Sequence, residues 1–311
     1  MYWGSVRFYK HLILLTFALV LIGTGAFATA KAIDNSRLRD ELKAAKTDKL
    51  EKLLYLNQKE ASYAWQIVAQ NSASSGFDHD FDLEYQNLYP ELNVGEIPEQ
   101  TASSDTVYLT FDDGPSPLTE NVLDILKDKG IKATFFVIGK NLDDESGKRI
   151  LKRIVEEGHG IGIHSYSHVY KSIYASVGNY LDDFYATYNR IYDITGVRAE
   201  IFRFPGGSIN GYSSAIYKEI IAEMLRRGFV YYDWNVSSLD AAARTTTPQI
   251  YNSVVRGAGQ RTRSIVLMHD SSDKRNTMNA LPEIIDHLTT DGYRFDIITR
   301  NVAPIIFGYS D

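Results

Sequence analysis

From Thr106 onward, short apolar runs alternate with longer stretches in which apolar residues recur at helical spacing. The short runs predict strands at Thr106–Phe111, Lys132–Ile138, Ile161–His164, Ile201–Phe204, Val230–Asp233, Ser264–His269 and Tyr293–Phe295. The longer stretches predict helices at Leu118–Lys129, Lys148–Glu157, Tyr180–Thr195, Ser213–Arg227, Thr247–Gly257 and Met278–Thr290. This alternation predicts an α/β fold with a parallel sheet, and so many units favour a distorted (β/α) barrel of about seven parallel strands.

The N-terminal 30 residues have the pattern of an export segment. Arg7 and Lys10 precede an uncharged apolar run from Leu12 to Phe27. Its length lies between that of a signal peptide and that of a full membrane span, and residues 28–30 have the small-residue spacing of a cleavage site. A membrane anchor through residues 12–27 and a cleaved signal peptide both remain open. Because the positive charges precede the run, we expect all that follows to lie outside the cytoplasmic membrane, either anchored or secreted.

The remaining sequence predicts four further segments. Residues 31–70 carry leucines close to heptad spacing among charged residues, which indicates a helical stalk whose oligomeric state stays unknown. Residues 71–105 have linker composition, except for a patch from Leu83 to Leu92 that we expect to pack on the following domain. Residues 106–300 form the predicted main domain, and residues 301–311 a tail.

Composition narrows the class of protein. With 311 residues, 44% of them hydrophobic, the chain can bury a large core. A net charge of -6 argues against a nucleic-acid partner, which would require a basic face. The absence of cysteine excludes disulfides, thiolate metal sites and a cysteine nucleophile.

Candidate chemistry begins where the first predicted strand ends. Asp112 and Asp113 follow the apolar run and precede Gly114-Pro115. The carboxyl ends of barrel strands are where such folds place active sites. Because side chains alternate along a strand, two neighbouring acids can serve one site only if the chain bends, and we expect the Gly-Pro pair to supply that bend. A simple turn that closes the strand is the alternative.

Histidines follow two other predicted strands. His164 and His168 are four residues apart, so one helical turn would bring both imidazoles onto one face. Together with a carboxylate from another strand end they would make a metal site. Leu267 and His269 share a face of the sixth predicted strand.

Two further polar positions lie at the same predicted rim. Arg203 precedes a Pro205-Gly206 turn whose backbone N–H groups can face a pocket, and Asp240 follows the fifth predicted strand. Isolated salt bridges would account for each of these residues singly. Their common place at the carboxyl ends of strands indicates one site.

The region from about Thr106 to Ile298 resembles a polysaccharide deacetylase domain of carbohydrate esterase family 4, also called the NodB homology domain. It is similar to the membrane-anchored peptidoglycan N-acetylglucosamine deacetylases. The resemblance rests on five stretches in order, which are Thr110-Phe111-Asp112-Asp113-Gly114-Pro115, His164-Ser165-x-x-His168, Arg203-x-Pro205-x-Gly207, the Asp240 region and Leu267-x-His269.

The resemblance implies a role for each matched residue. Asp113, His164 and His168 would hold a divalent metal, usually Zn²⁺, with Co²⁺, Mn²⁺ and Ni²⁺ as alternatives. Asp112 would be the general base paired with Arg203, His269 the general acid tuned by Asp240, and Leu267 would line the pocket for the acetyl methyl. The chain departs from the family pattern at Gly206, where many members have an aromatic residue, at Ala241 in place of tryptophan, and at Ser237 in place of an aspartate.

General chemistry agrees with these roles. One carboxylate and two imidazoles leave open positions on Zn²⁺, as a catalytic site requires. A bound water can then be deprotonated by Asp112, and the developing oxyanion can be held by the metal and the Gly206 N–H. His269 would protonate the leaving amine.

Four functions are therefore compared. The leading one is metal-dependent N-deacetylation of an envelope glycan, with N-acetylglucosamine in peptidoglycan as the expected substrate. The alternatives within enzymes are an O-acetyl esterase acting on xylan or a related glycan, and a chitooligosaccharide deacetylase. A non-catalytic glycan-binding or scaffold protein is the alternative from another class.

Overall fold

The computed structural model describes residues 83–308. The predicted export segment, the stalk and the first part of the linker lie outside these residues. Within them, no helix has the length and apolar character needed to cross a bilayer.

One parallel sheet forms the centre of the domain. Its strand order is β5-β4-β3-β2-β1-β7-β6, with β8 paired to β1, and each of these pairings is parallel. The strands are β1 (Thr106–Asp112), β2 (Thr134–Ile138), β3 (Gly160–Ser165), β4 (Ile201–Phe202), β5 (Val230–Tyr231), β6 (Val236–Ser237), β7 (Arg263–His269) and β8 (Arg294–Phe295). Strands β5 and β6 end the strand order, so the sheet is a curled half-barrel. The predicted α/β barrel-like fold is confirmed at this level.

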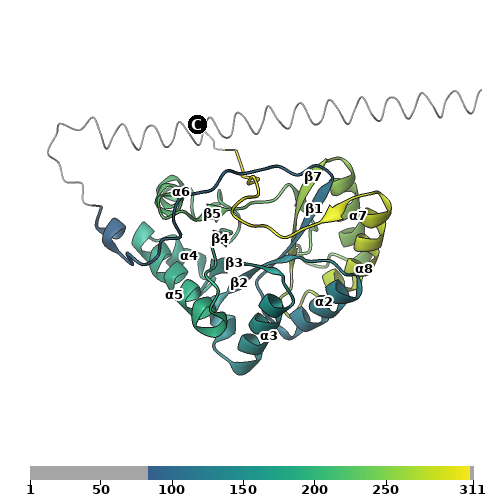
Figure 1. Cartoon of the computed structure of the whole chain (residues 1–311), viewed down its shortest axis with the longest axis horizontal. Coiled ribbons are helices and arrows are strands. Elements are labelled where there is room, and N and C mark those ends of the chain that lie inside the picture. The colour runs from purple at the N-terminus through teal and green to yellow at the C-terminus, as the bar shows by residue number, and fades with distance from the viewer. Residues whose placement is uncertain (1–82, 309–311) are drawn as a thin grey trace, which may run out of the picture. The chain divides into compact units, whose positions relative to one another are not determined.

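Helices line the outer side of the curled sheet (Figure 1). They are α2 (Pro117–Asp128), α3 (Glu145–Glu156), α4 (Tyr170–Ile173), α5 (Val177–Thr195), α6 (Tyr217–Arg226), α7 (Thr247–Gly259) and α8 (Arg275–Thr290). Two short 3₁₀ helices, η1 (Glu84–Asn87) and η2 (Gly139–Leu142), complete the described elements. Pro117 occupies the first turn of α2 after the cap residue Ser116, where its missing N–H costs no hydrogen bond.

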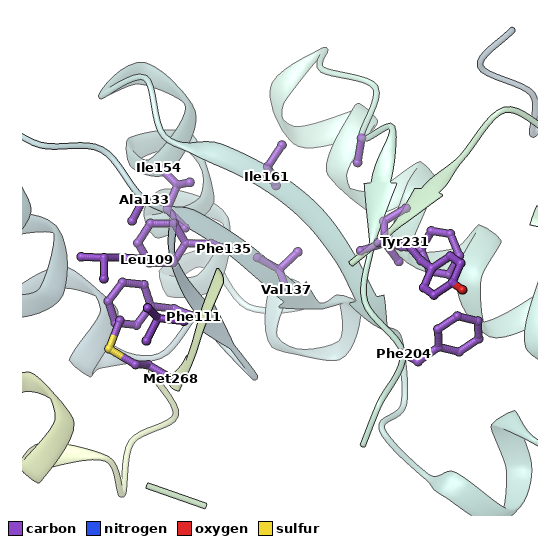
Figure 2. Packing of buried hydrophobic residues seen from close by; sticks show 14 of the residues in the cluster. Leu109, Phe111, Ala133, Phe135, Val137, Ile154, Ile161, Phe204, Tyr231 and Met268 are labelled. Atoms are coloured by element: carbon purple, nitrogen blue, oxygen red, sulfur yellow. The ribbon is translucent and has the colours of Figure 1, made fainter. Parts of the chain in front are cut away.

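Alternation along β1 separates the core from the site. Val107, Leu109 and Phe111 belong to the cluster that packs between sheet and helices, whereas Tyr108 belongs to a second cluster on the other face. Figure 2 shows Phe111 close to Phe135 and Met268, and the two phenyl rings stack with centroids 5.2 Å apart. Asp112 shares the face of Tyr108 because side chains two residues apart point the same way. The inner face therefore ends in a carboxylate.

Some elements differ from their predictions. Strand β6 was not predicted separately because Val236 is its only apolar residue and lies between Asn235 and Ser237, so no apolar run marks it. Helix α6 begins at Tyr217 rather than Ser213. The side chain of Asn210 accepts a hydrogen bond from the Ser213 N–H at 3.0 Å, and this turn delays the helix.

Candidate active site

The bend between the two neighbouring acids occurs at Asp113 itself. Its φ is 73°, in the left-handed region that few residues other than glycine adopt. The prediction that Gly114-Pro115 supplies the bend was therefore wrong in its location, although that pair follows directly with a cis peptide bond. The bend lets Asp112 stay on the inner face of the sheet while Asp113 turns toward β3.

Asp112 lies in a buried ion pair. Its Oδ1 accepts a hydrogen bond from Arg203 Nη1 at 2.9 Å, and the two side chains are almost inaccessible to water. Burial raises the pKa of Asp112, and the charges of Arg203 and His269 oppose that rise. The predicted pairing of Asp112 with Arg203 is thus present in the structure.

Arg203 is fixed by further contacts. Its guanidinium donates to the Tyr232 carbonyl at 2.8 Å and to Thr110 Oγ1 at 2.6 Å, and it lies 4.3 Å from the ring centroid of Phe136. A planar cation with several directed donors holds the carboxylate more rigidly than a lysine would.

Asp113, His164 and His168 form a compact cluster. Asp113 Oδ1 lies 3.4 Å from His164 Nε2 and 3.3 Å from His168 Nε2. His168 reaches this position from a turn in which its own φ is 55°, not from the helical turn that the spacing predicted. The turn forms because Ser165 Oγ accepts from the His168 N–H at 3.1 Å.

The cluster fits a divalent metal. His164 Nδ1 lies 2.9 Å from the Arg203 carbonyl, which can only accept, so Nδ1 carries the proton and Nε2 keeps its lone pair. Burial lowers the pKa of His164 to about 3, so the imidazole stays neutral as a ligand must. Asp113 Oδ1 is buried without a hydrogen-bond partner in the described structure. One donor atom from each of the three residues lies within 4.8 Å of the other two, and a bound cation would satisfy the Asp113 oxygen that has no hydrogen-bond partner.

A second acid–imidazole pair stands beside Asp112. In the sheet register Asp112 of β1 lies opposite His269 of β7. Asp240 Oδ1 lies 2.7 Å from His269 Nδ1, and its Oδ2 accepts from the His269 N–H at 2.8 Å. Burial alone would lower the pKa of His269, but the hydrogen bond and charge of Asp240, with Asp112, raise it to about 9. His269 is therefore protonated at neutral pH, with Nε2–H available as a donor.

The remaining predicted residues border the same space. Leu267 is opposite Thr110 in the sheet register and is 7% exposed. The Pro205 carbonyl accepts from the Tyr174 hydroxyl at 2.8 Å, which anchors the turn that follows. Gly206 is exposed with φ 78°, and its N–H donates to no group in residues 83–308. It is free to donate to a ligand.

A polar cavity of about 490 Å³ opens on one side of the cluster. Asp113 and His168 contribute to its wall, and Asn141, Ser146 and Ser271 line it farther out. Asp144 and the apolar residues Ile138 and Ile150 also line the cavity, so its wall combines polar and apolar groups, as ligand-binding sites commonly do.

Sequence patterns did not reveal several residues that position the site. The Asp183 carboxylate accepts from the Tyr166 N–H at 2.6 Å and the Ser167 N–H at 2.9 Å, which fixes the turn that carries His168. Asn141 Nδ2 donates to the Asp113 carbonyl at 2.9 Å. Both lie on elements far from their partners in sequence, so no local spacing indicated them.

Asp270 is a third such residue. Its Oδ2 accepts from Thr119 Oγ1 at 2.5 Å, and its N–H donates to the Asp112 carbonyl at 3.1 Å. Burial raises its pKa to about 7. A Cβ at Gly114 would lie 2.3 Å from Asp270 Oδ2, so only glycine fits between this carboxylate and the turn. The sequence could have indicated Asp270 only through its position directly after His269.

Comparison with known proteins agrees with this geometry. The sequence profile described as polysaccharide deacetylase matches residues 99–225. The Bacillus subtilis protein YheN, named for polysaccharide deacetylase, is 32% identical over 234 residues, which are 73% of this chain and 79% of YheN. The chain belongs to the polysaccharide deacetylase family.

Two solved structures and one further sequence relative are also similar to this deacetylase. The catalytic domain of a peptidoglycan N-acetylglucosamine deacetylase from Eubacterium rectale is 34% identical with a TM-score of 0.64, and the match covers 70% of this chain and 98% of that one. A family 4 carbohydrate esterase from Streptococcus mutans is 30% identical with a TM-score of 0.59, covering 67% of this chain and 93% of that one. A bifunctional xylanase/deacetylase from Pseudobutyrivibrio xylanivorans is 34% identical over 64% of this chain but only 31% of its own length.

Proposed function

We propose that this deacetylase hydrolyses the N-acetyl group of N-acetylglucosamine residues in peptidoglycan. The similarity to the Eubacterium rectale catalytic domain supports this substrate. The observation that carries the proposal is the unpaired Asp113 Oδ1 between two imidazoles, beside an Asp112 held by Arg203. Such an arrangement combines a metal site with an independent proton acceptor.

Asp113, His164 and His168 would hold the metal, and we propose Zn²⁺ because imidazole and carboxylate ligands suit that ion. When bound, the ion supplies Lewis-acid chemistry that polarises the acetyl carbonyl and acidifies water. The tautomer of His164 set by the Arg203 carbonyl presents Nε2 to the ion without any rearrangement.

The protein's own groups complete the reaction. Asp112 accepts a proton from the water whose oxygen bonds to the acetyl carbon. The Gly206 N–H donates to the carbonyl oxygen as that oxygen gains negative charge, and Leu267 packs against the acetyl methyl. His269 gives its Nε2 proton to the sugar nitrogen as the C–N bond breaks, so acetate and a free amine leave. Asp240 orients His269 and keeps it protonated.

Neighbouring carboxylate variants test this assignment. Asp112→Asn should retain metal but lose about 10²- to 10⁴-fold in turnover, the usual contribution of a positioned base. Asp113→Asn should lose metal, and an excess of Zn²⁺ should partly restore its activity. A chelator should inactivate the parent, and reloading should reverse this. An Asp112→Asn enzyme with parental turnover would refute the mechanism, and one without metal would mean the two roles are exchanged.

Acetate release from several glycans tests the substrate. Peptidoglycan, chitooligosaccharides and acetylxylan should be compared at equal enzyme concentration. The xylan arm is included because the Pseudobutyrivibrio relative is named as a xylanase/deacetylase. Faster release from acetylxylan would replace the proposed substrate, and no release from any glycan by metal-loaded protein would favour a non-catalytic glycan-binding role.

We also propose that residues 12–27 anchor or export the domain, so that catalysis takes place outside the cytoplasmic membrane. The uncharged run after Arg7 and Lys10 supports this. Protease added to intact cells stripped of their wall should digest the domain. Protection until lysis would contradict the placement.

A further inference from the structure

Two tyrosines, Tyr170 and Tyr212, extend from the site to the surface of the domain. Tyr212 is 53% exposed, and its ring centroid lies 5.3 Å from that of the half-buried Tyr170. The Tyr170 ring in turn meets the His168 ring edge-on, with centroids 5.2 Å apart. The two rings therefore continue outward from the catalytic cluster to the surface.

The absence of a side chain at Gly206 makes room for the Tyr170 ring. A Cβ at Gly206 would lie 2.9 Å from Tyr170 Cε1, so a side chain at this position would displace the tyrosine. The Tyr170 ring therefore packs directly beside the exposed residue Gly206.

A hydrogen-bonded turn presents Tyr212. Asn210 Nδ2 donates to the Pro205 carbonyl at 3.1 Å and to the Gly207 carbonyl at 3.0 Å. Asn210 Oδ1 accepts from the Tyr212 N–H at 2.8 Å. One side chain therefore ties the backbone of Tyr212 to the loop that carries Gly206. A single exposed tyrosine needs no explanation, but one tied to the catalytic loop and in ring contact with a residue of the site does.

We propose that Tyr170 and Tyr212 form an aromatic wall that stacks on a pyranose ring of the neutral glycan bound across the site. This rests on the proposed function for the ligand class. A pyranose has an apolar C–H face and a polar rim, which match the face and hydroxyl tip of tyrosine. No hydrogen bond within residues 83–308 uses either hydroxyl, so both are available to sugar hydroxyls. The wall carries no charge that would select an anionic ligand.

Calorimetry on the full chain in an Asp112→Asn background tests the wall directly, with chitotetraose, soluble peptidoglycan fragments and acetylated xylotetraose as probes. Tyr212→Ala should weaken binding of the tightest probe about 10-fold by removing the apolar surface that the sugar covers. Tyr212→Phe should stay within about twofold of the parent. Tyr170→Leu, which keeps an apolar side chain beside Gly206, should also bind about 10-fold more weakly.

Tyr192→Ala is the matched control. Tyr192 is 45% exposed and lies in the last turn of α5, and that helix returns the chain to the opposite edge of the sheet. The Tyr192→Ala variant should bind each probe with the affinity of the parent. With Asp112 restored, Tyr212→Ala should raise KM on the glycan, whereas Tyr192→Ala should keep the parental KM.

Parental affinity in Tyr212→Ala would overturn the wall, and so would an equal loss in Tyr212→Phe or a parent that binds none of the three probes. The proposed function fails separately. A chain that binds glycan through Tyr212 but releases no acetate would contradict deacetylation and leave the wall standing. Acetate release with an unchanged KM in Tyr212→Ala would support deacetylation and contradict the wall.

Discussion

At the scale of single residues, Arg203 determines whether Asp112 can serve as a base. The carboxylate is buried at the end of β1, where it would otherwise bind a proton. A fully buried guanidinium at 2.9 Å favours its charged form. Because both ions are removed from water, the loss of either leaves the other uncompensated.

Arg203→Met should therefore lower the free energy of unfolding by about 3–5 kcal/mol, the usual cost of a broken buried pair. The variant should also raise the pKa of Asp112, so the acid limb of kcat/KM should move to higher pH. Urea unfolding and a pH series measure these two effects. Adding Asp112→Asn should recover part of the stability, since no buried carboxylate remains. A double variant less stable than Arg203→Met would contradict this coupling.

Asp240 acts through the proton on His269. With a pKa of about 9, His269 should lose its proton, and kcat/KM should fall, only above that pH. Asp240→Asn removes the charge that offsets burial, so the basic limb should move by at least about one pH unit toward neutral. Thr277 Oγ1 donates to Asp240 Oδ2 at 2.8 Å, and Thr277→Val is the control that keeps the carboxylate. An unmoved basic limb in Asp240→Asn would exclude His269 as the acid.

At the scale of elements, the strands with long apolar runs were predictable from local sequence, whereas turns held by long-range contacts were not. Apolar runs predicted β1 and β7 closely, because their residues are buried on both faces. Periodicity could not reveal β6, which has a single apolar residue, or the left-handed turn at His168. That turn depends on Asp183 from α5, a contact between segments that no local rule connects.

Asp183→Ala should loosen this turn and weaken metal binding about 10- to 100-fold, the usual effect of removing a group that orients a ligand. Competition with a chromogenic chelator measures the affinity, and circular dichroism checks the fold. Asp182→Ala is the matched control, because its carboxylate accepts from the Tyr89 hydroxyl instead. Equal metal affinity in the two variants would mean that the turn holds His168 without Asp183.

At the scale of the whole domain, the segment before β1 is part of the folded unit. The predicted packing of Leu83–Leu92 is confirmed, since Leu92 is fully buried and Tyr89 stacks on Tyr185 with centroids 4.0 Å apart. Composition indicated this patch by its tyrosines. It could not indicate the partner Arg227, which is buried and donates to the Tyr89 and Leu88 carbonyls at 2.8 Å. The limits of the stalk, linker and catalytic domain stay predictions.

We call residues 83–97 the strap, because the buried Arg227 ties them to the domain. Arg227 pairs with the buried Glu223 at 2.6 Å, and the strap carbonyls satisfy the rest of its donors. The strap also passes so close to Gly228 that a Cβ there would lie 1.8 Å from the Gly95 carbonyl oxygen. Removal of the strap would expose apolar surface and leave a guanidinium without its acceptors.

Two shortened chains test the strap. The chain that starts at residue 83 keeps every strap contact described and is the reference. A chain that starts at residue 98 should melt about 10 °C lower, which corresponds to about 3–5 kcal/mol for a domain of this size. Differential scanning calorimetry measures both. Arg227→Met in the chain from residue 83 should reproduce much of the loss, and equal melting of the chains from 83 and 98 would show that the strap packs without stabilising the domain.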